Sequence, residues 1–261
     1  MTGLALGNKS TMETRAPVRS PARSWRDRRL DRDHVLGLRL TLAAVAAFLV
    51  LVPFALLASL VVGSWPPLHA LDVEVTGAMH RYALDNPAWT STMNVWTEVF
   101  GPGPLRIAAL PLVIGLWRRG ARRLAVWVVT TMAVGGLLGP LLKVLVGRHR
   151  PDLLDPVSDA TGYAFPSGHA LNATLAAGVL LVIFLPAVRD RSRARGALWV
   201  TALALAGVTG LSRIALGVHW TSDVLAGWLL GAAVLAATCA TFAVWRDRPP
   251  GDPLRADGRD G

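Results

Sequence analysis

The sequence has little charge and almost no cysteine, and each shortage excludes a class of protein. Charged residues make up 17% of the 261 residues, whereas a soluble domain usually carries about 25%. In their place stand apolar stretches of roughly 20 residues or more, the length that a helix needs to cross a hydrocarbon core of about 30 Å. The single cysteine, Cys239, lies inside such a stretch, so no disulfide can form within the chain. We therefore expect a multi-span membrane protein.

Basic residues outnumber acidic ones, 27 to 17. In a soluble protein this excess would suggest nucleic-acid binding, but beside apolar stretches it fits the Lys and Arg that gather on the cytoplasmic flanks of membrane helices. The expected partner is therefore the lipid bilayer and not a nucleic acid. The sequence makes no prediction of the oligomeric state.

Six apolar stretches predict an all-α fold, an integral membrane bundle of six transmembrane helices. Their approximate bounds are 36–62, 94–117, 124–146, 168–187, 197–211 and 221–245. The chain thus divides into a disordered, basic cytoplasmic tail, a six-span membrane domain and a cytoplasmic C-terminal tail. These three parts cover residues 1–35, 36–245 and 246–261.

Two segments interrupt this pattern. Residues 63–90 are mixed in polarity and include Trp65 and Trp89, which is typical of a segment at the membrane interface. The second apolar stretch is broken by Gly101 to Pro104. We interpret this break as the outer cap of a helix rather than as a hinge.

The distribution of basic residues predicts the topology. Six spans place both termini on one side of the membrane, and 21 of the 27 basic residues fall on that side. By the positive-inside rule both termini are cytoplasmic, and we expect the protein in the inner (plasma) membrane. Four of the remaining basic residues cluster at the outer ends of spans three and five, and such residues near membrane depth indicate a functional site. They are Lys143, Arg148, Arg150 and Arg213.

Three short motifs fall at this outer face: KVLVGRHRP from Lys143, PSGH from Pro166 and SRIALGVHWTSD from Ser212. The PSGH motif enters a helix, whose N-terminus offers free N–H groups and a partial positive charge to an anion. We expect the three motifs to form a site for a tetrahedral dianion such as phosphate. Each motif supplies residues that bind the phosphate. They are Lys143, Arg150, Ser167, Gly168 and Arg213.

Two histidines and an aspartate supply the reactive groups. His219 and Asp223 are four residues apart, so on a helix they share a face, and the carboxylate can hold one ring nitrogen while the other is free to attack. His169 is the candidate general acid for the leaving alcohol. Asp223 also suits the first turn of the sixth helix. No acidic cluster accompanies the histidines at metal-ligand spacing, so we expect no metal and no cofactor; the nearby acids belong to an ordinary loop, at Asp152, Asp155 and Asp159.

Several neighbouring residues fit less specific roles. Arg148 suits either a contact with lipid headgroups or a contact with the substrate. We interpret His149 as a bystander in its loop. The other histidines have no partners at useful spacing: His34, His69 and His80.

The three motifs resemble those of the type 2 phosphatidic acid phosphatase superfamily, K-x6-RP, PSGH and SR-x5-H-x3-D, without a mismatch. This resemblance implies a phosphatidic acid phosphatase/haloperoxidase-like core and a membrane lipid phosphatase. It implies that His219 is the nucleophile that forms a phosphohistidine, that Asp223 orients it and that His169 protonates the leaving group. The superfamily also contains soluble vanadium haloperoxidases, but the membrane spans argue against that branch.

The expected function is hydrolysis of the terminal phosphate of a lipid at the outer membrane face. Phosphatidate, phosphatidylglycerol phosphate and a polyprenyl diphosphate such as undecaprenyl diphosphate all fit, with a slight preference for the polyprenyl carrier. The alternatives are a non-enzymatic protein that binds or transports lipid phosphates, and a vanadate-dependent peroxidase. A protein that only binds phosphate needs the cations but has no use for two histidines and an aspartate together.

Overall fold

The computed structural model describes residues 45, 46 and 48–246, and over these residues it is helical, with no strand. The predicted all-α fold is confirmed. The predicted tails, 1–35 and nearly all of 246–261, lie outside the described residues. The helices are Phe48–Val62, α2 (Pro66–Asp85), α3 (Pro87–Val99), α4 (Pro102–Arg118), α5 (Arg122–Val146), α6 (Gly168–Phe184), η1 (Leu185–Val188), α7 (Ser192–Ala215) and α8 (Thr221–Arg246).

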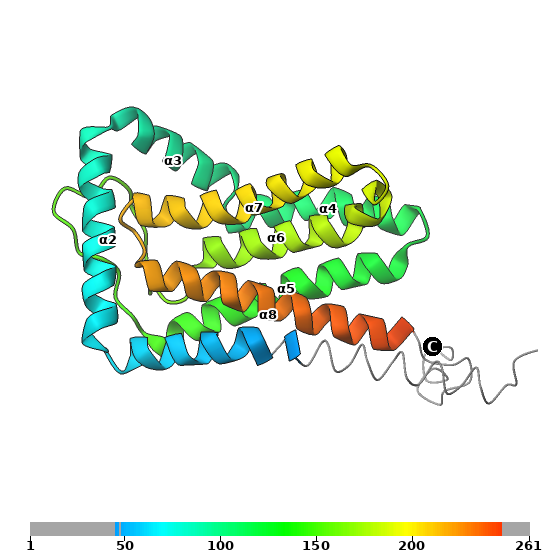
Figure 1. Cartoon of the computed structure of the whole chain (residues 1–261), viewed down its shortest axis with the longest axis horizontal. Helices are drawn as coiled ribbons and strands as arrows, with labels where there is room; N and C mark the ends of the chain where they lie inside the picture. The colour runs from blue at the N-terminus through cyan, green and yellow to red at the C-terminus, as the bar shows by residue number, and fades with distance from the viewer. Residues whose placement is uncertain (1–44, 47, 247–261) are drawn as a thin grey trace, which may run out of the picture.

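Helix α6 lies at the centre of the bundle. Its sequence is apolar on all sides, as expected of a helix that is surrounded by others, and it packs against α4, α5, α7 and α8. These helices run along the long axis of the molecule, whereas α2 lies across one end of them (Figure 1). The interior of the bundle is therefore built around α6, and α2 covers the end at which α6 and α8 begin.

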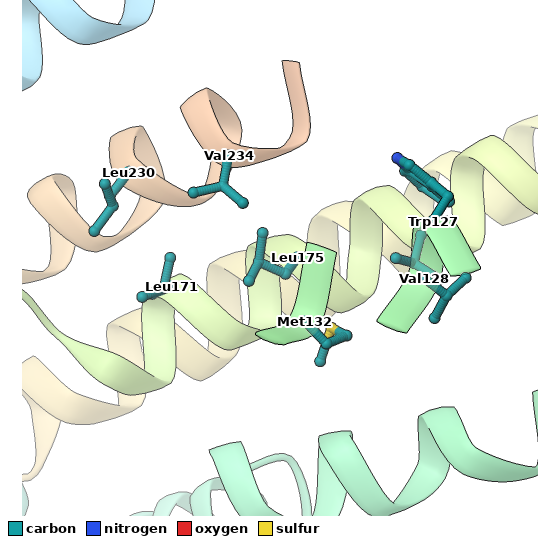
Figure 2. Close-up of a cluster of buried hydrophobic side chains, with 8 residues drawn as sticks. Trp127, Val128, Met132, Leu171, Leu175, Leu230 and Val234 are labelled. Atoms are coloured by element: carbon teal, nitrogen blue, oxygen red, sulfur yellow. The ribbon is translucent and has the colours of Figure 1, made fainter. Parts of the chain in front are cut away.

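The main buried cluster joins three helices. Figure 2 shows its aromatic and aliphatic side chains, which come from α5, α6 and α8. They pack at low exposure and hold the three helices together. The cluster consists of Trp127, Val128, Met132, Leu171, Leu175, Val179, Leu230 and Val234.

Four helical segments are long and apolar enough to span a membrane: α5, α6 with η1, α7 and α8 as far as Phe242. Two further pairs pass the same test together but are bent. The helix Phe48–Val62 meets α2 at 91°, and α3 meets α4 at 44°. The described residues thus contain four candidate spans, or six if each bent pair counts as one span. The predicted multi-pass membrane protein is confirmed, and the predicted six spans agree with the larger number.

The bounds of two predicted spans are wrong. The predicted span 94–117 begins within α3 and runs across the break at Gly101, because hydropathy does not register a helix end between two apolar segments. Gly101 caps α4 and Pro102 occupies its first turn, where a missing N–H costs nothing. Helix α7 is longer than the predicted 197–211 at both ends, because charged residues such as Arg193 are good helix formers even where they end an apolar run.

Two glycines of α8 let it approach the start of α6 closely. A Cβ atom on Gly227 would lie 2.6 Å from the carbonyl oxygen of Ser167 and 2.8 Å from the Cβ atom of Ala170. A Cβ atom on Gly231 would lie 2.7 Å from that of Thr174. Small residues four apart are a common means of close helix packing in lipid, where apolar burial provides little drive for association.

We expect Gly227→Ala to destabilise the protein, because the added methyl group would collide with the backbone of α6. Overpacking of this kind costs about 1–3 kcal/mol. The matched control is Gly207→Ala in α7, where a Cβ atom would meet nothing within 4 Å. The thermal unfolding midpoint in detergent should fall for Gly227→Ala and stay the same or rise for Gly207→Ala. Equal midpoints would contradict the close packing of α8 on α6.

Candidate active site

The three sequence motifs meet in one pocket at the end of the bundle where α6 and α8 begin. The pocket has a volume of about 470 Å³ and is bounded by the end of α5, the loop 147–167, the start of α6, the end of α7 and the turn 216–220. Six of the eight predicted site residues line it, namely Lys143, Arg150, Gly168, His169, Arg213 and His219. The other two, Ser167 and Asp223, are fully buried behind them.

His219 and Asp223 form a hydrogen-bonded pair, as their spacing predicts. The Nδ1 atom of His219 lies 3.3 Å from Oδ2 of Asp223, and its Nε2 atom lies 3.2 Å from Nη1 of Arg150. A carboxylate can only accept, so it favours the tautomer that carries the proton on Nδ1 and leaves a lone pair on Nε2. Asp223 also accepts the backbone N–H of Trp220 at 2.9 Å, so it caps α8 in addition to holding His219.

Burial keeps His219 neutral. Its side chain is 2% exposed. Loss of hydration lowers the pKa of His219 from 6.5 to about 4, and the hydrogen bond that its ring donates to Asp223 opposes this shift only in part. A neutral imidazole whose Nε2 carries a lone pair is a nucleophile at physiological pH once the phosphate replaces the Arg150 N–H that this atom accepts here.

The PSGH motif starts α6 and ties it to α8. Ser167 is the N-cap of α6, and its hydroxyl accepts the backbone N–H of Ala170. The backbone N–H of Ser167 donates to the carbonyl of Asp223 at 2.9 Å. The predicted phosphate contact of Ser167 stays a prediction, because in this structure its hydroxyl caps the helix. His169 follows one residue later on the pocket wall.

Gly101 contributes to the site in a way that the sequence does not reveal. A Cβ atom at this position would lie 3.4 Å from Nε2 of His169 and 2.9 Å from the carbonyl oxygen of Thr97. The predicted cap is confirmed, since Gly101 caps α4, but the same residue also lies against the histidine. The break between α3 and α4 is therefore part of the pocket wall on the His169 side.

Two cations of the pocket donate to backbone carbonyls of the loop 147–167. Arg150 donates to the carbonyls of Gly162 at 2.9 Å and of Val218 at 2.6 Å, with longer bonds to Thr161 and Tyr163. Lys143 donates to the carbonyl of Tyr163. Both side chains therefore converge on one short stretch of loop that faces the pocket.

The third cation, Arg213, has unused hydrogen-bonding capacity. It is 5% exposed, and its Nη1 atom donates to the hydroxyl of Thr97 at 3.0 Å. Its Nε–H is buried and finds no partner within the part of the chain that the structure describes. A buried donor without a partner costs about 1–3 kcal/mol, so this N–H is a candidate donor to a ligand in the pocket that Arg213 lines.

In this structure Arg148 binds two carboxylates, and its contact with lipid headgroups or with substrate stays a prediction. It is largely buried and donates to Asp72 of α2 and to Asp223, each at 2.6 Å. The sequence pattern misses Asp72, because it lies 151 residues before Asp223 in a segment without a motif. Asp72 reaches Arg148 only in the folded protein, where α2 lies across the end of the bundle.

Two histidines that were expected to lack partners have them. His80 is buried, and its Nε2 atom lies 2.9 Å from the carbonyl of Leu154. His69 packs edge-on against the ring of Trp220. Both contacts hold α2 against the loops beside the pocket, and neither residue lines it.

Comparison with known proteins decides the family. The family model of the PAP2 superfamily matches residues 124–247. A curated relative, decaprenylphosphoryl-5-phosphoribose phosphatase of Mycobacterium tuberculosis, is 36% identical over 170 residues, which are 62% of this chain and 86% of that protein. The chain belongs to the PAP2 superfamily.

Further PAP2 proteins match over different lengths. An undecaprenyl-diphosphatase of Sulfolobus acidocaldarius is 32% identical over 42% of this chain and 51% of its own length. The chain spans about half the length of this and another curated relative. The crystal structure of a transmembrane PAP2 type phosphatidylglycerolphosphate phosphatase from Bacillus subtilis superposes with a TM-score of 0.65 at 21% identity, over 79% of this chain and 98% of that one. The fold is therefore that of a transmembrane PAP2 protein.

The burial of His219 predicts an unusual titration. In protein labelled with ¹⁵N-histidine, the ring nitrogens of His219 should keep the shifts of a neutral imidazole as the pH falls through 6.5, and should change only near pH 4. The sign follows because burial disfavours the charged form, so a lower pH is needed to protonate the ring. His219→Ala identifies the resonances. A midpoint near 6.5 would contradict the buried, neutral histidine.

Proposed function

We propose that this PAP2 protein is a membrane lipid phosphatase that works through a phosphohistidine on His219. The observation that carries the proposal is the orientation of His219, whose Nδ1 atom faces Asp223 while its Nε2 atom faces a pocket that also holds three cations. A site that only binds phosphate has no need of this arrangement. The match to phosphatases of the same superfamily supports the proposal.

In the first step, Nε2 of His219 attacks the phosphorus of a lipid phosphate. The N–P bond forms as the P–O bond to the lipid breaks, and His169, in the protonated form that the negative charge of a bound phosphate favours, gives its proton to the departing oxygen. Asp223 stabilises the charge that develops on the His219 ring. Lys143, Arg150 and Arg213 stabilise the phosphoryl oxygens, so these cations do the work that a metal ion does in many phosphoryl-transfer enzymes.

In the second step, water cleaves the phosphohistidine. His169, now neutral, takes a proton from the water as its oxygen attacks the phosphorus, and the N–P bond breaks to give inorganic phosphate and free His219. The pocket wall supports this dual role, since His169 and His219 both line it. The N-terminus of α6, from Gly168 onward, adds free backbone N–H groups and a partial positive charge.

A polyprenyl carrier is the substrate class that we favour. Two of the relatives are named as phosphatases of polyprenyl phosphate compounds, and a long, flexible isoprenoid can reach a pocket at the end of the bundle from the bilayer. Phosphatidate and phosphatidylglycerol phosphate are the other candidates. The pocket itself recognises the phosphate that all of them share.

We further propose that the pocket lies at the outer face of the inner (plasma) membrane. The basic residues at the opposite ends of the helices support this orientation, including Arg118 at the end of α4, Arg122 at the start of α5, and Arg189 to Arg195 around the start of α7. Both termini would then be cytoplasmic, and the membrane domain would cover residues 36–245 between two cytoplasmic tails.

The first test is phosphate release by the purified protein in detergent with EDTA. Undecaprenyl diphosphate, phosphatidate and phosphatidylglycerol phosphate are compared. We expect release that survives EDTA, with the polyprenyl diphosphate hydrolysed fastest, and a loss of roughly 10⁴-fold or more in His219→Ala because the nucleophile is missing. His149→Ala, in the neighbouring loop, should stay near the wild-type rate. No release from any of the three by folded protein would favour a protein that only binds lipid phosphates.

A second test separates the roles of the two histidines. His169→Ala should slow hydrolysis of a lipid phosphate by about 10²- to 10⁴-fold, because the departing alkoxide lacks a proton donor. The loss should be much smaller with p-nitrophenyl phosphate, whose leaving group departs without protonation. His219→Ala should abolish both reactions. An equal loss on both substrates in His169→Ala would contradict its role as general acid.

A further inference from the structure

A buried chain of charges connects α2 to the candidate nucleophile. Arg148 lies between two carboxylates, with Nη2 bound to Asp72 and Nη1 bound to Asp223, each at 2.6 Å. Both aspartates are fully buried, and the Arg148 side chain is 14% exposed. Asp223 in turn faces His219. The order of contacts is therefore Asp72, Arg148, Asp223 and His219.

Asp72 also holds the first turn of α8 directly. Its Oδ1 atom accepts the backbone N–H of Ser222 at 2.9 Å, and its Oδ2 atom accepts the Ser222 hydroxyl at 2.5 Å. Ser222 precedes Asp223, so this carboxylate fixes the backbone from which Asp223 projects. Arg148 additionally lies over the ring of Trp220, 5.6 Å from its centre. Both partners of the ion pair are thus fixed from several sides.

We propose that Arg148 and Asp72 are positioning residues: Arg148 favours the ionised form of Asp223, and both residues hold Asp223 in its orientation toward His219. The proposal rests on the proposed phosphohistidine mechanism, which gives Asp223 its task. Among the described residues, Arg148 is absent from the lining of the pocket that holds His219. It lines a neighbouring pocket of about 490 Å³. It therefore acts on the reaction through Asp223 and not by touching the phosphate.

The hydrogen bonds of Asp223 explain how its carboxylate is held in one orientation. Each oxygen of Asp223 has its own donors, Arg148 on Oδ1 and His219 with the Trp220 N–H on Oδ2. A carboxylate held at both oxygens cannot rotate away from the imidazole. Without Arg148, only the donors on Oδ2 would hold it, and a displacement of about 1 Å near a reacting group can cost about 10²-fold in rate.

Charge gives Arg148 a second effect. Asp72 and Asp223 bind the same guanidinium, so removing this cation would leave two carboxylates together in a dry site, where they tend to share one proton. Lys143 and Arg150 also act electrostatically on Asp223, but they lie on the pocket side. A proton on Asp223 would deprive His219 of its acceptor and so weaken the nucleophile.

This effect of charge predicts that a second substitution will restore part of the activity lost in Arg148→Gln. Arg148→Gln should lower kcat by about 10²-fold, with KM within about threefold of the wild type, because the phosphate contacts remain. Asp72→Asn in the same chain should restore part of that loss, since it removes the carboxylate that competes for ionisation with Asp223. Asp72→Asn alone should lower kcat less than Arg148→Gln. Asp85→Asn, at the exposed end of α2, is the matched control and should match the wild type.

A purely structural link would behave differently. If Arg148 only fastened α2 to the bundle, losing both residues would be at least as harmful as losing one, and the double variant would show no recovery. Rates are therefore expressed per folded molecule, counted by monodisperse elution and the unfolding midpoint in detergent. An unchanged kcat in Arg148→Gln, or a double variant slower than Arg148→Gln, would overturn the proposal.

The tautomer of His219, measured without substrate, tests the positioning role of Arg148 independently of the proposed activity. In ¹⁵N-histidine-labelled protein at neutral pH, His219 should show the tautomer protonated on Nδ1. Arg148→Gln should shift it toward a mixture, and the added Asp72→Asn should shift it back. If the wild type releases no phosphate from any lipid, the proposed function fails and this shift still decides the positioning. If His219 keeps its tautomer in Arg148→Gln, the positioning fails even for an active enzyme.

Discussion

Asp223 is fully buried, and hydrogen bonds from three parts of the chain converge on it. Arg148 of the loop 147–167, the Trp220 N–H and His219 bind its carboxylate, and the N–H of Ser167 at the start of α6 binds its carbonyl. A buried carboxylate that lost its partners would cost several kcal/mol. The loop, the turn before α8 and the start of α6 can therefore move little relative to one another, and the pocket lies where they meet.

The pocket residues that belong to the three motifs could be predicted from sequence because their relations are local, whereas Pro102 and Asp159 to Tyr163, which also line the pocket, were not predicted. His219 and Asp223 are only four residues apart and make the expected hydrogen bond, although His219 lies in the turn before α8 and not on the helix, and Ser167 caps the helix that its own motif begins. These features depend on a few consecutive residues and on the ends of strongly apolar helices. For the same reason the bounds of α5, α6 and α8 agree closely with the apolar stretches.

The supporting residues could not be predicted, because their relations depend on packing across the bundle. Asp72 meets Arg148 only because α2 turns through 91° after the preceding helix and crosses the end of the bundle (Figure 1). Gly101 meets His169 only because the chain breaks between α3 and α4. The sequence marks both places, through the mixed polarity of residues 63–90 and the break at Gly101 to Pro104, but it gives neither the direction of α2 nor the neighbours of Gly101.

The carbonyls of Thr161, Gly162 and Tyr163 bear on how the proposed enzyme releases its product. Three cations around one phosphate would hold it tightly, and a tightly held product limits turnover. In this structure, however, Arg150 and Lys143 donate to those carbonyls, so a phosphate oxygen gains only the difference between two sets of hydrogen bonds. In the proposed enzyme these carbonyls would compete with phosphate for the two cations, and the affinity for inorganic phosphate would be lower than the charges alone would give.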